Sequence, residues 1–200
     1  MPRTLLACSL VLALGAVEGA AFANGRFPRA QRLIEDNGDA ERLTLAATYG
    51  LLVTNDRGGE WRHVCELAYA FSRDELDPLV EIPPDGSMLV TAAHSLNRAP
   101  RPFCAFEPVL GGAGTETVVD YALDASNRSR VLAMHMSSGD EGIVNSLYES
   151  LDAGRTFAPF GTPLPAADVA FAVTLDIAPS EPNRIYVSAA GKAEAELLLR

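Results

Sequence analysis

The chain has 200 residues, 48% of them apolar and 21% charged, with a formal net charge of −10. This length and balance suit one globular domain with its own core. Acidic charge without clustered Lys and Arg argues against binding nucleic acid, and it disfavours anionic membrane surfaces.

Residues 1–23 have the three-part pattern of a secretory signal peptide. Arg3 supplies the positive start, residues 5–17 form an apolar run, and Ala21-Phe22-Ala23 is a small-x-small cleavage site. A transmembrane anchor is the alternative, but spanning a bilayer takes about 20 apolar residues. We therefore predict cleavage after Ala23 and a secreted or periplasmic protein, with no transmembrane span after signal cleavage.

Four short apolar segments recur in the remaining chain, each after a polar turn and each rich enough in β-formers to predict a strand. The segments are residues 42–47, 88–93, 130–135 and 184–189. Their first strongly apolar residues are Leu43, Leu89, Val131 and Ile185, which are 46, 42 and 54 positions apart in turn. An uneven period in the forties fits a four-stranded propeller blade.

The predicted fold is all-β, an incomplete β-propeller of about three and a half four-stranded blades in residues 24–200. The predicted repeat units lie near 40–65, 86–106, 129–160 and 184–200. Helical signals are weak: residues 27–35 could form a short turn of helix, and residues 193–199 contain helix formers.

Three and a half blades cannot close a ring, because propellers typically have about 4–8. We expect this chain to be a fragment of a longer propeller. The alternatives are completion as a homo-oligomer, if the chain truly ends at Arg200, or exposed unpaired sheet edges.

Two turns fit the pattern Ser/Thr-x-Asp-x-Gly-x-x-aromatic and lie 96 positions apart, as two blades of 48 would be. They contain Thr54, Asp56, Gly58 and Trp61 in the first, and Ser150, Asp152, Gly154 and Phe157 in the second. The Asp can accept backbone N–H groups within a tight hairpin, to which the hydroxyl adds a further bond. The Gly permits a backbone conformation that a β-carbon resists, and the aromatic ring can be buried between sheets.

This pattern resembles the Asp-box, or BNR repeat, of sialidases, sortilin-like receptor domains, xyloglucan-degrading glycosidases and photosystem assembly factors. The resemblance implies structural roles for the eight residues, because these boxes lie at blade turns away from the catalytic face in that family. The second repeat unit departs from the pattern. Ser95 is followed by Asn97 in place of Asp, no Gly follows, and the aromatic is Phe103.

Cys65 and Cys104 are the two cysteines left after signal cleavage. An even cysteine pair in an exported chain predicts a disulfide bond, which would stabilise by roughly 4 kcal/mol on the chain-entropy model. The bridge could brace the degenerate second box. Two separate buried thiols are the alternative.

The sequence shows no complete catalytic set. Carboxylates are available at Asp120, Asp124, Asp140 and Glu141, but nothing in the sequence pairs two of them as a glycosidase requires. His63 and Cys65 lack further zinc ligands, and the alternation of Met134, His135 and Met136 along a strand favours core packing over copper binding. We expect neither a metal nor a cofactor.

The leading hypothesis is an exported, non-catalytic propeller-like protein that binds or scaffolds an unknown protein or glycan through its blade loops. Whether the protein is an enzyme is left uncertain, leaning towards no. One alternative is a fragment of a secreted glycoside hydrolase, sialidase-like or xyloglucanase-like, with catalytic residues elsewhere. Another alternative is an envelope assembly factor.

Overall fold

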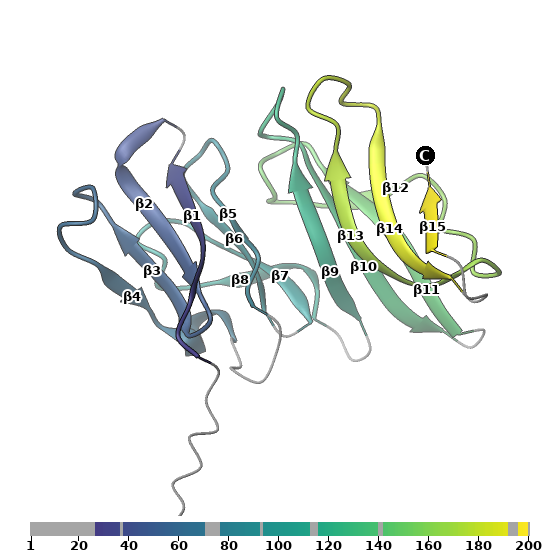
Figure 1. Ribbon diagram of the computed structural model, residues 1–200, viewed down its shortest axis with the longest axis horizontal. Helices are drawn as coiled ribbons and strands as arrows, with labels where there is room; N and C mark the ends of the chain where they lie inside the picture. The colour runs from purple at the N-terminus through teal and green to yellow at the C-terminus, as the bar shows by residue number, and fades with distance from the viewer. Residues whose placement is uncertain are drawn as a thin grey trace, which may run out of the picture.

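The computed structural model describes residues 27–36, 38–70, 77–92, 94–112, 116–139, 142–191 and 196–199. The predicted signal peptide, residues 1–23, lies outside these residues. Four antiparallel sheets stand side by side in chain order, from blade 1 at the left of Figure 1 to blade 4 at the right. Strand neighbours within each sheet are also neighbours in sequence, so each blade is a simple meander.

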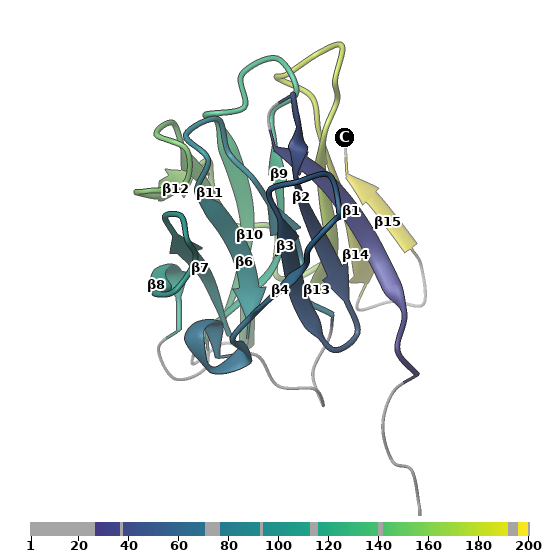
Figure 2. The same ribbon diagram turned by 90° about the vertical axis from the view of Figure 1, so that its left-hand side faces the viewer.

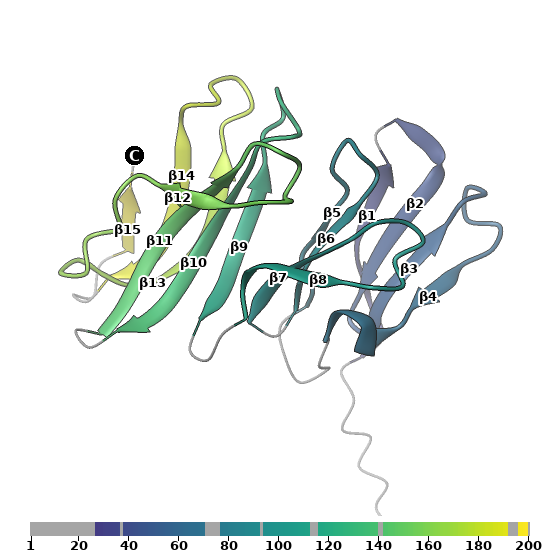
Figure 3. The ribbon, with the colours of Figure 1, turned by 180° about the vertical axis from the view of Figure 1, so that it is seen from behind.

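Blades 1 to 3 have four strands each, and blade 4 has three among the described residues. The strands of blade 1 are β1 (Ala30–Asp36), β2 (Asp39–Ala47), β3 (Gly50–Thr54) and β4 (Arg62–Val64). A short 3-10 helix, η1 (Glu66–Tyr69), precedes blade 2, whose strands are β5 (Val80–Glu81), β6 (Met88–Ala92), β7 (Ser95–Ala99) and β8 (Glu107–Gly111). Blade 3 consists of β9 (Thr117–Leu123), β10 (Val131–Gly139), β11 (Gly142–Ser150) and β12 (Ala158–Phe160). Blade 4 consists of β13 (Val169–Ile177), β14 (Ile185–Gly191) and β15 (Glu196–Leu199). Figure 3 shows the row from behind, with β8 and β12 in front of their sheets.

This arrangement confirms the all-β fold class and the incomplete propeller of about three and a half blades. Each predicted repeat unit begins at or close to the second strand of its blade, and the first strands β1, β5, β9 and β13 precede the units. The predicted helical turn over residues 27–35 is wrong, because β1 occupies most of that segment. Cross-strand pairing decides it: Leu33 lies opposite Leu45 of β2, and such packing overrides local propensity. In residues 193–199, the described part is likewise the strand β15.

Three apolar clusters form the core, one between each pair of successive blades. Adjacent residues of the second strands face opposite blades. On β6, Met88 packs in the cluster shared with blade 1, whereas Leu89 packs towards blade 3. On β10, Val131 packs towards blade 2 and Leu132 towards blade 4. Strands buried on both faces explain why the sequence shows apolar runs instead of clean alternation.

The predicted disulfide bond is not formed, because Cys65 and Cys104 are both free and exposed. Cys65 follows β4 of blade 1, and Cys104 lies in the connection between β7 and β8 of blade 2. Their side chains face solvent, so the alternative of two buried thiols is also wrong. Cysteine parity carries no information on the Cβ–Cβ separation that a bridge requires.

Candidate functional site

The first sequence motif forms the hairpin between β3 and β4, residues 54–61, which we call the N-terminal box turn. The Thr54 hydroxyl donates to Asp56 Oδ1 at 2.6 Å and accepts the Gly58 N–H at 3.1 Å. Asp56 Oδ1 also accepts the Glu60 N–H at 2.9 Å. Two side-chain oxygens therefore satisfy backbone donors that no strand reaches.

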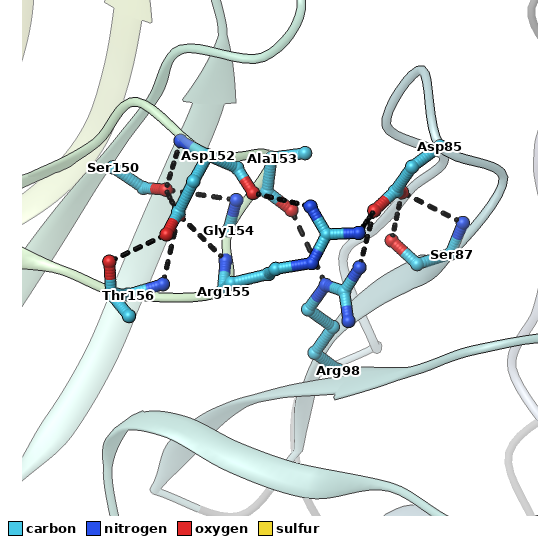
Figure 4. Close-up of polar contacts among 9 residues, drawn as sticks. All are labelled: Asp85, Ser87, Arg98, Ser150, Asp152, Ala153, Gly154, Arg155 and Thr156. Atoms are coloured by element: carbon cyan, nitrogen blue, oxygen red, sulfur yellow. Dashed lines mark hydrogen bonds and ion pairs between the residues drawn. The ribbon is translucent and has the colours of Figure 1, made fainter.

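The second motif forms the hairpin between β11 and β12, residues 150–157, which we call the C-terminal box turn (Figure 4). The Ser150 hydroxyl donates to Asp152 Oδ1 at 2.7 Å and accepts the Gly154 N–H at 2.9 Å. Asp152 Oδ1 accepts the Arg155 and Thr156 N–H groups at 3.1 and 2.9 Å. Asp152 Oδ2 accepts the Thr156 hydroxyl at 2.7 Å. The two box turns thus share one hydrogen-bond plan, with an added hydroxyl donor in the second.

These hydrogen bonds shift both carboxyl groups towards ionisation. The Thr54 hydroxyl and the Glu60 N–H lower the pKa of Asp56 below its usual value. Burial alone would raise the pKa of Asp152, but donors from Thr156, Ser150 and Arg155 outweigh it and lower the pKa to about 2. A carboxylate that binds protons so weakly is a poor general base near neutral pH. It is a strong acceptor for the turn.

The glycine of each turn has a left-handed backbone, with φ +93° at Gly58 and +75° at Gly154. A β-carbon at Gly154 would lie 2.7 Å from Leu89 Cδ1 of blade 2, whereas one at Gly58 would first meet the Trp61 ring at 3.4 Å. Phe157 packs against the cluster between blades 2 and 3. The C-terminal box turn is therefore part of a junction between blades.

In blade 2 the corresponding hairpin is residues 99–106, between β7 and β8, which we call the proline turn. The predicted match of residues 95–103 is out of register. Ser95 begins β7, whereas the box hydroxyl residue ends the third strand of its blade. The aromatic position is filled by Phe106, which packs on the cluster between blades 1 and 2, 5.5 Å from the Tyr69 ring centre. Phe103, buried with φ +66°, takes the place of the glycine.

In every blade an acidic residue lies at the end of the first strand or in the turn that leads to the second strand, a stretch that we call the first connection. In blade 2 this residue is Asp85, which accepts the Ser87 hydroxyl and N–H at 2.6 and 3.1 Å. Its other oxygen contacts Arg98 of the same blade at 2.5 Å and Arg155 of the C-terminal box turn at 2.6 Å (Figure 4). Burial would raise the pKa of Asp85, but Ser87 and the two arginines lower it.

The junction between blades 1 and 2 repeats this arrangement. Arg101 occupies the position of the box Asp in the proline turn, and its guanidinium contacts the buried Asp36 at the end of β1. Arg155 and Arg101 therefore both join a turn of one blade to the first connection of the preceding blade. The sequence analysis did not identify Arg101 or Arg155 as residues that join two blades. The recurring acid before each second strand was the available signal.

The other carboxylates of the sequence analysis lie apart. Asp124 accepts the Ser126 hydroxyl at 2.6 Å and pairs with Arg130 at 3.1 Å, and its pKa is lowered because these contacts outweigh burial. Asp120 on β9 accepts the Leu175 N–H of blade 4 at 2.7 Å. Burial, with the like charge of Asp176, raises its pKa. Asp140 and Glu141 lie outside the described residues.

The histidine candidates are also separated. His63 Nε2 lies 4.0 Å from Glu66, and the buried His135 lies 3.7 Å from Glu116 and packs edge-on against Tyr148. Met134 is fully buried in the cluster between blades 3 and 4. Among the described side chains, no three His, Cys, Asp or Glu residues gather as metal ligands would.

An open groove of about 520 Å³ lies on the side of blades 2 and 3 that carries the turns. It is lined by Arg98, Pro100, Arg101, Pro102, Cys104, Ala105, Glu107, Val109 and Arg155. Three of these residues are arginines whose acidic partners lie at the blade junctions. The groove could hold a polar ligand or a peptide loop.

No protein-family profile matches the chain, and no curated protein matches it. Among solved structures, the chain is similar to an ancestral GH74 enzyme, with 13% identity and a TM-score of 0.56 over 82% of this chain and 22% of that one. It also matches the GH74 enzyme of Niastella koreensis, with 12% identity and a TM-score of 0.48 over 82% of this chain and 29% of that one. The GH74 xyloglucanase of Xanthomonas campestris matches with 18% identity and a TM-score of 0.40, over 82% and 37% of the two chains.

The chain thus spans between about a fifth and two fifths of the length of these enzymes. The likeness to the ancestral enzyme supports the β-propeller fold and, at this identity, the fold alone. Within the described residues there is no helix long and apolar enough to cross a bilayer.

Proposed function

We propose that this chain is an exported propeller segment that binds or scaffolds a partner through its blade loops and does not catalyse a reaction. The box turns are Asp-boxes in this proposal, and their carboxylates hold the hairpins. The supporting observation is that Asp85 and Asp152 each accept several donors, which keep their pKa values low. Such carboxylates are suited to structure more than to proton transfer.

The binding place we propose is the arginine-lined groove beside the proline turn. Arginine retains several N–H donors after one ion pair has formed, so Arg98 and Arg155 can still reach carboxylate or hydroxyl groups of a ligand. An acidic or polyhydroxylated partner fits this chemistry, which includes a glycan or an acidic protein loop. Two prolines give the groove wall a stiff backbone, which lowers the entropy cost of binding.

Direct binding and turnover measurements test this function. The exported chain is titrated with a panel of neutral and acidic oligosaccharides, and hydrolysis products are followed in parallel. We expect saturable binding without turnover. Ala105→Trp in the groove should abolish the binding. Ala125→Trp, at an exposed turn elsewhere, is the matched control. Robust hydrolysis by the wild-type chain would refute the proposal.

Asp120 favours a second candidate, a segment of a glycoside hydrolase. A carboxyl with a raised pKa, near a second carboxyl, is what general acid catalysis requires. The structural likeness to a GH74 enzyme is compatible with this candidate. Hydrolysis lost in Asp120→Asn, with the thermal unfolding midpoint retained, would favour the enzyme.

A further inference from the structure

Two grooves meet at the proline turn, one on each side of Arg101 and Pro102. The first is the arginine-lined groove of about 520 Å³, which lies towards blade 3. The second has a volume of about 400 Å³ and lies towards blade 1. It is lined by Asp39, Glu41, Arg42, Val53, Asn55, Arg62, Arg101, Pro102 and Phe103. Because Arg101 and Pro102 line both grooves, the two form one double groove that spans three blades.

The double groove lies beside the outer strands of the blades. Glu107 and Val109 of β8 line its first part, and Arg62 of β4 lines its second part. Both strands are edge strands of their sheets. Figure 2, which looks onto blade 1, shows β8 and β12 together at the left, at the outer edge of the row. A ligand can therefore approach from the outer edge of the blades.

The lining carries an excess of positive charge although the chain is acidic. Five arginines line the double groove, against three acidic residues, whereas the whole chain has a formal net charge of −10. A local reversal of charge of this kind attracts an anionic ligand and rejects a cationic one. The arginines are Arg42, Arg62, Arg98, Arg101 and Arg155.

Arginines in both parts of the double groove retain charge for a ligand. In the first part, Arg98 and Arg155 share the single carboxylate of Asp85, which therefore offsets only one of the two positive charges. The side chain of Arg155 is 54% exposed and can reach a ligand. In the second part, Arg62 is exposed, and its side chain forms no ion pair or hydrogen bond with another described residue. Positive charge at both ends favours a ligand with several separated carboxylates.

The uncharged part of the lining favours a peptide over a glycan. Val109 lines the first part and Val53 the second, beside two prolines of the turn. Apolar side chains of a peptide can be buried against these residues. The aromatic ring in the lining, Phe103, is only 3% exposed and lies under the Arg101 guanidinium, 4.9 Å from its ring centre, so it offers no open face to a sugar. Recognition of acidic peptide motifs by clustered arginines is a recurring mode of binding.

We propose that the double groove binds an extended acidic peptide segment of a partner protein, with carboxylates on both sides of the proline turn. The inference rests on the proposed function, for which it names the class of partner and adds the groove beside blade 1. One end of the segment pairs with Arg155 and the other with Arg62. The chain between them crosses the turn at Arg101 and Pro102.

Titration with synthetic peptides of two lengths tests this inference. The probes repeat Glu, Val and Pro and contain about four and about twelve residues, so they extend over at most roughly 14 and 40 Å. The long peptide should bind about tenfold more tightly than the short one, because only the long peptide reaches both parts of the double groove. A long peptide with Gln in place of Glu should bind about tenfold more weakly, because it lacks carboxylates. Acidic oligosaccharides should also bind about tenfold more weakly than the long acidic peptide, because they lack apolar side chains.

Variants of the second part separate the double groove from the first groove alone. Arg62→Glu reverses a charge there, and Asn55→Trp fills the space at an exposed position. Each should weaken binding of the long acidic peptide by about tenfold. Arg184→Glu, at an exposed arginine of blade 4, makes the same change in net charge and should leave the affinity within about twofold. An unchanged thermal unfolding midpoint shows that each variant is folded.

The two free cysteines report where the peptide binds. Cys104 lines the first part of the double groove, whereas Cys65 lines neither part, and both are exposed. The long acidic peptide should slow alkylation of Cys104 and leave the alkylation of Cys65 unchanged. Peptide binding that leaves Cys104 unprotected would overturn the inference.

The remaining outcomes distinguish this inference from the proposed function. Acidic oligosaccharides that bind as tightly as the long acidic peptide would overturn the peptide partner and leave the binding function in place. Equal affinities for the long and short peptides, or full affinity in Arg62→Glu and Asn55→Trp, would overturn the double groove. Binding of neither peptides nor oligosaccharides would overturn the proposed function as well.

Discussion

The C-terminal box turn and the proline turn occupy the same place in neighbouring blades and are held by different chemistry. In the box turn, Ser150 and Asp152 bind the backbone of their own hairpin. In the proline turn, Ala99 and Arg101 stand at those positions, and Arg101 contacts Asp36 of the preceding blade. The box turn combines these local side-chain hydrogen bonds with the contact of Arg155 to Asp85 of blade 2, whereas the side chain of Arg101 in the proline turn makes the tertiary contact. The aromatic position is retained in both, as Phe157 and Phe106, because each ring packs against a cluster between blades.

This comparison shows that the packing of the blade sets the shape of the hairpin. The hydrogen bonds of the box turn and the arginine contact of the proline turn are two ways to stabilise that shape. Changes to the box turn should therefore act through its own hydrogen bonds and through its contacts with blade 2. Changes to the proline turn should act through the junction with blade 1.

The largest effect is expected at Gly154. Replacement by Ala imposes a left-handed backbone on a residue with a β-carbon and crowds Leu89, which together should cost about 3 kcal/mol of unfolding free energy. Gly58→Ala has the same backbone problem without the crowding and should cost about 1 kcal/mol. Urea unfolding followed by tryptophan fluorescence measures both. Equal costs would show that Leu89 moves aside freely.

Arg101→Asp should be the next most damaging change, at about 2 kcal/mol, because it places a second carboxylate against the buried Asp36. Arg155→Asp is the matched variant at the next junction. It should cost less, since Asp85 keeps Arg98 and Ser87 as partners. Thermal unfolding of the two variants ranks them, and the reverse order would contradict the assignment of these junctions.

Ser150→Ala should cost about 1 kcal/mol, because it removes a donor to Asp152 and leaves the buried Gly154 N–H without an acceptor. The reciprocal change, Ala99→Ser, should not stabilise the fold and should cost about 1 kcal/mol, because Ala99 is fully buried and Arg101 stands where the acceptor of the new hydroxyl would be. The denaturant midpoints of the Ser150→Ala and Ala99→Ser variants measure both changes in stability. A gain in stability from Ala99→Ser similar to the loss from Ser150→Ala would mean that the proline turn can form the hydrogen bonds of a box turn once the hydroxyl is supplied.

The smallest expected effect is on the loss of stability at acidic pH. The pKa of Asp152 is lowered from its usual 3.8 to about 2 in the folded protein. The unfolded chain therefore binds the proton first, so this group stabilises the fold above pH 3.8 and loses that contribution as pH falls towards 2. Melting temperatures across this window should fall less steeply in Asp152→Asn, and Thr156→Val should give an intermediate slope. An unchanged slope in both variants would remove Asp152 from the acid response.

Features that depend on short stretches of sequence could be predicted. The pattern from Thr54 to Trp61 specifies its turn because the hydroxyl, the carboxylate and the glycine act within eight positions of one another. The period of the second strands was equally visible, because each blade needs an apolar strand buried on both faces.

Features that depend on distant partners could not be predicted. The segment of β1 has weak strand propensity, and Leu33 becomes part of a strand through its pairing with Leu45 of β2. The register of the proline turn was missed because its hydroxyl and carboxylate are absent and only Phe106 remains. Cys65 and Cys104 were paired on parity, whereas their separation depends on how blades 1 and 2 pack.

By itself, the sequence determined the blade as the repeating unit and the internal chemistry of the two box turns, because both rest on interactions between near neighbours in the chain. Tertiary structure alone decided the junctions, where Arg101 meets Asp36 and Arg155 meets Asp85 across tens of positions. An arginine in a surface turn looks the same in sequence whether it faces water or an acid of the next sheet. Only the packing of one blade on another brings each arginine to its acid, and it buries Asp36 much more than Asp85.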